Sequence, residues 1–162
     1  MYRTTIAAVA ALLAFAPSAL AAGTLTKAEV IKQGTGICKA AEKSVERLPQ
    51  PRSQNPFSAT APKGDAARGE AFLKGYADAL QSIRTGLAGL KAPTQDRQLL
   101  QSFLAQLGPV IATFRQARTD ALEGHNTTAI HTVQRAFALW TKASAKTRAY
   151  GFPKGVCQSG SS

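Results

Sequence analysis

The sequence predicts an all-α protein, a four-helix bundle that follows a removable signal peptide. Three observations predict it. Apolar residues recur at spacings of three and four along four stretches of the chain, which is the period of an amphipathic helix. Two of the three connections between these stretches are short, and short connections make neighbouring helices antiparallel. Two cysteines, Cys38 and Cys157, lie near the two ends of the expected domain.

The first 21 residues have the three parts of a secretory signal peptide. Arg3 gives a positive start, residues 6–15 form an apolar run, and residues 19–21 (ALA) form a small-x-small cleavage pattern. We expect cleavage after Ala21, with Ala22 as the alternative. The apolar run is shorter than the roughly 20 residues that a membrane helix needs. A lipoprotein signal requires a cysteine directly after the small residues of the cleavage pattern, and this chain has none there. We therefore expect a bacterial periplasmic or secreted protein with no stable membrane span and no lipid anchor.

Residues 22–162 are expected to form a single basic helical domain. Removing the signal peptide takes away one cation, Arg3, and lowers the net charge from +11 to +10. A domain of this size buries about 70% of the surface of its unfolded chain, which is enough for a core without metals. The abundance of apolar side chains argues against disorder despite the high charge.

The first helix is expected over residues 27–48. Thr26 and Glu29 have the spacing of a capping box, in which each side chain satisfies a free backbone amide at the helix start. Gly34 and Gly36 lie inside this segment, and each glycine costs about 1 kcal/mol in a helix interior. Either another backbone packs closely against the glycines, or the helix is broken and restarts there.

A proline-rich loop is expected over residues 49–63. It is longer than the usual connection between helices and, when extended, long enough to cross the whole bundle. The relative direction of the first two helices is therefore open. Phe57 is the one large apolar residue that could pin this loop to the core.

The remaining helices have clear stripes of apolar residues. The second is expected over 65–90 with Asp65 as its N-cap, and the third over 95–122 with Thr94 as its N-cap. The fourth is expected over 127–150, capped by one of the two residues Asn126 and Thr127.

The end of the fourth helix and the second cysteine form a further predicted unit. Gly151 is expected to end the helix in a left-handed conformation, with Phe152 making the accompanying hydrophobic contact. Cys38 and Cys157 are expected to form a disulfide, because an even count in an exported chain favours one and the Cys-x-x-Cys spacing of a redox pair is absent. The tail must then fold back along the first helix.

No complete catalytic, metal, haem or nucleotide motif occurs in the sequence. A covalent haem site needs Cys-x-x-Cys-His, which is missing, and Met1 leaves with the signal peptide. His125 and His131 are six residues apart, a spacing that does not suit two histidine ligands of one haem. Asp120, Glu123 and His125 are expected to form a solvated polar turn and not a metal site. We therefore expect no catalytic residue, no cofactor, no metal ligand and no enzymatic activity.

The expected function is that of a non-enzymatic binding or interaction module. The expected partner is an anionic envelope component, which the positive charge favours, or another exported protein. A nucleic acid is not expected as a partner outside the cytoplasm. The alternative is a carrier of a small apolar ligand in the bundle core. Its lining would be the aromatic side chains spaced along the inner faces of the helices, although ordinary core packing explains the same spacing: Phe72, Tyr76, Phe103, Phe114, Phe137 and Trp140.

Overall fold

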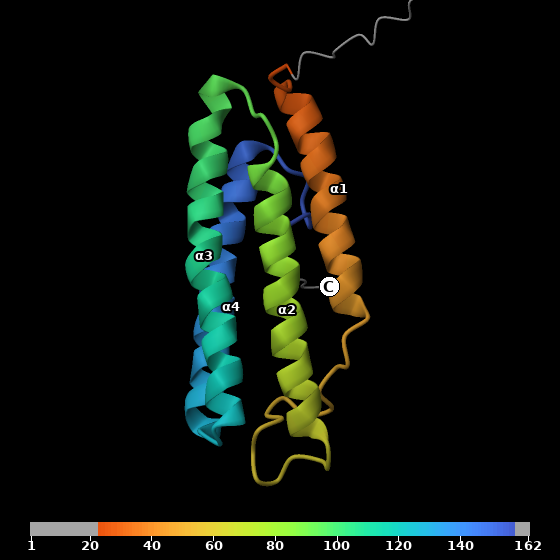
Figure 1. Cartoon of the computed structure of the whole chain (residues 1–162), viewed down its shortest axis with the longest axis vertical. Coiled ribbons are helices and arrows are strands. Elements are labelled where there is room, and N and C mark those ends of the chain that lie inside the picture. Colours follow the sequence, from red (N-terminus) through yellow and green to blue (C-terminus); the bar gives the residue numbers. More distant parts are fainter. Residues whose placement is uncertain (1–22, 158–162) are drawn as a thin grey trace, which may run out of the picture.

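A computed structural model describes residues 23–157, and the predicted signal peptide, residues 1–21, lies outside them. The described residues form four helices and no strand (Figure 1). The predicted all-α four-helix fold is confirmed, and the predicted helix ends agree with the structure to within two residues. The helices are α1 (Lys27–Glu46), α2 (Asp65–Ala88), α3 (Thr94–Leu122) and α4 (Asn126–Tyr150).

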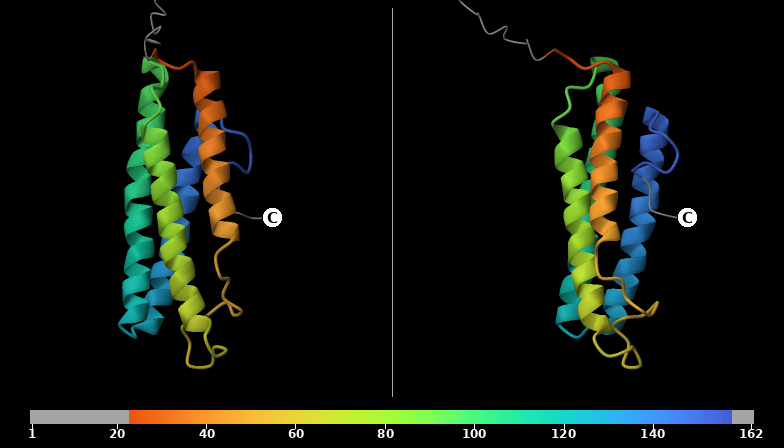
Figure 2. Two further views of the ribbon diagram at one scale, coloured as in Figure 1. Left: turned by 45° about the vertical axis from the view of Figure 1, so that its right-hand side comes forward. Right: turned by 90° about the vertical axis from the view of Figure 1, so that its right-hand side faces the viewer.

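Successive helices run in opposite directions (Figures 1 and 2). The backbone N–H of Leu25 donates to the carbonyl of Lys91 at 2.8 Å, so the start of α1 lies beside the end of α2. The ammonium of Lys27 lies 5.3 Å from the ring centroid of Tyr150, so α4 ends there too. The open question of direction is thereby answered. Residues 47–64 do not cross the bundle but stay at its other end, which we call the loop end.

The start of α1 is as predicted. The Thr26 backbone N–H donates to the Glu29 carboxylate at 2.8 Å, and the Glu29 backbone N–H donates to the Thr26 hydroxyl at 3.3 Å. These two bonds form the capping box. The helix then continues through both of its glycines without a break, so the alternative of a restarted helix is wrong.

Gly34 is explained by side chains and not by a second backbone. A Cβ atom at this position would lie 2.7 Å from the ring of Phe152 and 2.9 Å from Leu87. Only a residue without a side chain lets the tail and α2 approach α1 so closely. A Cβ atom at Gly36, by contrast, would have no neighbouring atom within 4 Å.

The other three predicted N-caps are wrong by one or two residues. Asp65, Thr94 and Asn126 are already the first residues of their helices, and Thr127 lies one residue further in. For Asp65 the reason is that its carboxylate serves the loop instead of the helix, as described below. The actual N-caps, none of which makes a side-chain cap hydrogen bond, are Gly64, Pro93 and His125.

Two side chains attach the proline-rich loop to α2. The buried carboxylate of Asp65 accepts hydrogen bonds from the backbone N–H groups of Arg52 and Ser53, at 2.7 and 2.9 Å, and from the Ser53 hydroxyl at 2.6 Å. These bonds stabilise the ionised form and lower the pKa of Asp65. Phe57 is buried against Gly69, the anchoring role expected for it.

The chain reverses after α4 as predicted. Gly151 has a φ of 108°, and the N–H of Phe152 donates to the carbonyl of Thr147 at 3.0 Å, which completes a Schellman cap. The tail then runs back between α1 and α4 (Figure 2). Cys38 and Cys157 form the predicted disulfide, with 5.2 Å between their Cα atoms.

Helix packing differs around the bundle. Direct contacts join α1 to α2, α2 to α3 and α3 to α4, and they are most extensive between α3 and α4. α1 and α4 make little direct contact with each other. The tail passes between them (Figure 2), and its residues Phe152, Val156 and Cys157 are buried.

Candidate ligand-binding sites

The six aromatic residues proposed as a ligand lining meet in the interior, where they contact one another. Tyr76 lies at their centre, with its ring centroid 4.8 Å from that of Phe114 and 5.6 Å from those of Phe72 and Phe137. Phe103 and Trp140 form a second pair, at 6.3 Å. These separations are those of rings in direct contact. The rings therefore pack against each other in two groups.

Two of the six also border a hollow at the loop end. This hollow has a volume of about 210 Å³ and lies between the proline-rich loop, α2 and α4. Its polar groups come mainly from the loop and from Gln134. Its apolar wall is made by Phe57, Phe72, Leu73, Ile130, Val133 and Phe137.

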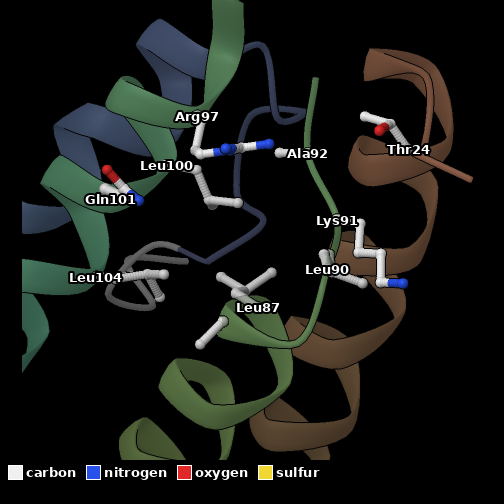
Figure 3. A pocket seen from close by; sticks show the side chains of 10 residues that line it. Thr24, Leu87, Leu90, Lys91, Ala92, Arg97, Leu100, Gln101 and Leu104 are labelled. Atoms are coloured by element: carbon white, nitrogen blue, oxygen red, sulfur yellow. The ribbon is translucent and has the colours of Figure 1, made fainter. Parts of the chain in front are cut away.

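A second hollow, of about 300 Å³, opens at the opposite end of the bundle (Figure 3). Leucines from the end of α2 and the start of α3 form its floor: Leu87, Leu90, Leu100 and Leu104. The Arg97 side chain extends from α3 across the mouth toward Ala92, whereas the ammonium of Lys91 points away (Figure 3). The sequence alone does not reveal this site, because most of its lining comes from two helix ends and the link between them.

A polar cluster lies where the tail meets α1. Burial raises the pKa of the Glu42 carboxyl, with Glu46 adding to the shift, although the nearby backbone N–H of Cys157 acts in the opposite direction. Burial and then the Glu42 charge raise the pKa of Tyr76 to about 12. The nearby indole N–H of Trp140 acts to lower the pKa of Tyr76, although this buried N–H has no hydrogen-bond partner. Neither hollow is lined by Glu42 or Trp140, so we regard the cluster as an anchor for the tail.

Most of the carboxylates are engaged within the molecule. Asp120 accepts hydrogen bonds from Gln116 and Thr132, at 2.7 and 3.0 Å. The ion pairs of the described residues take up further acidic groups: Lys27 with Asp96 at 3.4 Å, Lys74 with Asp78 at 2.9 Å and Arg118 with Glu70 at 2.9 Å. Three of the carboxylates are thus paired with cations within the molecule, and most Lys and Arg side chains of residues 23–157 form no ion pair.

The surface cations are least balanced on α4. This helix contains no Asp or Glu, and none occurs in the chain after Glu123. Arg135, Lys142 and Lys146 are seven and four residues apart, which places them on one stripe of the helix, and that stripe faces away from the buried Trp140. None of the three forms an ion pair within residues 23–157. No cationic stripe was predicted for this helix, although its lack of acidic residues can be read from the sequence.

The three side chains of the predicted polar turn between α3 and α4 do not converge on one point. The Nδ1 atom of His125 lies 3.5 Å from the carboxylate of the exposed Glu123, whereas the Asp120 carboxylate is directed toward α4. In the described part of the chain, no three His, Cys, Asp or Glu side chains gather closely enough to hold a metal ion.

Comparisons with protein-family models, curated proteins and solved structures find no match to this chain. None of the helices within residues 23–157 combines the length and hydrophobicity needed to cross a membrane. The disulfide fits a protein of an oxidising compartment. Any functional conclusion must therefore come from the surface and the hollows described above.

Proposed function

We propose that the protein is a non-enzymatic binding module of the bacterial periplasm or exterior, and that it holds an anionic envelope component on the outer face of α4. The observation that carries this proposal is the stripe of Arg135, Lys142 and Lys146 on a helix without a single carboxylate. A cation near an anionic surface contributes about 1 kcal/mol to binding. Three cations on one face therefore give useful affinity together with strong salt dependence.

The outer stripe of α1 is the natural comparison within the same molecule. Lys32, Lys39 and Lys43 have the same spacing of seven and four residues. α1 also carries Glu29, Glu42 and Glu46, and the charges of Lys32 and Lys39 act on the first two of these carboxylates. The field outside α1 is weaker for that reason, and α4 is the better docking face.

Charge-neutralised variants of the two stripes test the proposal. The triple variant R135Q/K142Q/K146Q and its control K32Q/K39Q/K43Q remove the same net charge. Five of the six side chains are exposed, and Lys146 is half-buried. Binding is measured by co-sedimentation with vesicles containing phosphatidylglycerol and by retention on immobilised dextran sulfate, between about 50 and 300 mM NaCl. The two probes distinguish a lipid headgroup from an anionic polysaccharide.

We expect the α4 variant to lose at least about tenfold in affinity for one of the two probes. The α1 variant should lose less than about threefold, and unmodified protein should weaken steeply with salt. Equal losses from both variants would show that only net charge matters. That result, or undetectable binding of the unmodified protein at low salt, would contradict a docking face on α4.

A carrier of a small apolar ligand is the second candidate, favoured by the hollow of about 210 Å³ that Phe72 and Phe137 border. Native mass spectrometry of protein purified from its own host should then show a retained ligand. The variant V133W should remove that added mass by filling the hollow. A bare protein mass in repeated preparations would contradict this function.

A further inference from the structure

We infer that the hollow opposite the loop end binds a medium-chain carboxylic acid, with the hydrocarbon chain on the leucine floor and the carboxylate on Arg97. This site is separate from the α4 stripe, and it does not depend on the proposed envelope partner. The inference rests on two independent features of the hollow, its uncovered apolar wall and the single cation directed across its mouth (Figure 3).

The leucine floor favours a hydrocarbon chain. Leu87 and Leu100 are buried, whereas Leu90 and Leu104 remain partly exposed and offer apolar surface that a ligand would cover. Covering apolar surface contributes about 25 cal/mol per Å². An apolar cavity of about 150 Å³ holds a benzene molecule. At about 300 Å³, this hollow has room for a chain of about eight carbons.

Arg97 supplies the recognition of the head group. Its guanidinium forms no ion pair with any described residue. The neighbouring Asp96 is buried and already paired with Lys27 at 3.4 Å. The planar fork of an arginine matches the two oxygens of a carboxylate, and one guanidinium balances one negative charge. A chain with a single terminal carboxylate therefore complements the hollow in both shape and charge.

Three probes separate the contributions of tail and head. Octanoate has both, 1-octanol has the tail without the charge, and acetate has the charge without the tail. Each is titrated into the signal-free, disulfide-bonded protein while amide shifts are followed by two-dimensional NMR. We expect octanoate to shift the amides of residues 87–104, octanol to shift the same amides with weaker binding, and acetate to shift none.

Three variants make the inference falsifiable. R97Q should weaken octanoate about five- to tenfold and leave octanol unchanged, whereas R115Q, which removes another unpaired arginine of α3 outside the hollow, should alter neither. A88F places a ring into the hollow from an exposed position and should abolish binding of both compounds. Shifts confined to residues that do not line the hollow, equal effects of R97Q and R115Q, or octanoate binding that A88F leaves intact would overturn the inference.

Discussion

The α3–α4 hairpin and α1 are held in the bundle by different means. Along the hairpin, side chains of the two helices pack directly, with Phe114 and Phe137 at 5.1 Å and Phe103 and Trp140 at 6.3 Å. α1 packs extensively on α2 among the helices, and its contacts with α3 and α4 include the ion pair of Lys27 with Asp96 and the contact of Lys27 with Tyr150. On its other side it meets the tail, through the ring of Phe152 over Gly34 and the bond to Cys157.

This difference shows how a helix with few direct neighbours is kept in place. The hairpin depends on burial of large rings between two long helices, which is distributed over many side chains. α1 depends on a short segment that acts as a wedge between α1 and α4 and is covalently fixed. Changes to the tail should therefore affect α1 strongly and the hairpin weakly.

The largest expected effect comes from removing the disulfide. The bond joins residues 119 positions apart, and in the chain-entropy account a loop of that length contributes about 4–5 kcal/mol to the free energy of unfolding. We expect the double variant C38S/C157S to lose about that amount in urea unfolding. Hydrogen exchange should show early loss of protection in α1 and the tail, while α3 and α4 keep theirs.

Reduction of the unmodified protein is the matched measurement. An unfolding midpoint that does not change on reduction would show that the wedge holds without its bond. Equal loss of protection in α1 and in the hairpin would show that the two regions are not held differently.

A pair of glycine substitutions in α1 should have opposite signs. G34A drives a methyl group into Phe152 and Leu87, and such overpacking costs about 1–3 kcal/mol. G36A meets nothing within 4 Å and should stabilise by up to about 1 kcal/mol, because alanine favours a helix more than glycine does. Chemical unfolding of the two variants side by side measures both. If G34A were neutral, the tail would not pack on α1 as described.

Asp65 holds the loop that follows α1, and its substitution should have a smaller effect. D65N replaces one of the two carboxylate oxygens by an NH2 group, so one of the N–H groups of Arg52 and Ser53 loses its acceptor. We expect a melting temperature lower by about 3–6 °C near neutral pH. The lowered pKa of Asp65 stabilises the fold above its usual value of 3.8, and this contribution is lost as the pH falls through the lowered value. The difference between D65N and the unmodified protein should shrink in that acidic range. A difference independent of pH would contradict the role of the charge.

Glu42 is expected to give the smallest effect, and of the opposite sign. Because burial raises its pKa above the usual 4.5, ionisation of Glu42 destabilises the fold as the pH rises through the raised value. E42Q should therefore raise the melting temperature by about 1–2 °C at pH 7 and change little at pH 4. E123Q, at the exposed turn far from the tail, serves as the control. A decrease at pH 7 would mean that the attraction between the charged carboxylate and the Cys157 backbone N–H outweighs the cost of burial.

The sequence was sufficient for the helices and the disulfide, and insufficient for the contacts between them. Apolar period predicts all four helices because burial of one face per helix decides their position. The cap at Asp65 was predicted wrongly because its best partners lie 12 and 13 residues earlier in a loop, which a local rule does not see. The close packing at Gly34 could not be predicted, because it depends on Phe152 far along the chain. The hollow beside Arg97 could not be predicted either, because it depends on how two helix ends and their link meet.

The bond between Cys38 and Cys157 also determines how the protein responds to force. It closes α2, α3, α4 and the proline-rich loop into a covalent ring, and it leaves the first part of α1 as an open arm. Pulling on the two ends of the oxidised chain can peel that arm but cannot extend the ring. At about 3.5 Å per residue, the 119-residue separation withholds about 400 Å of contour length, which only a reductant would release.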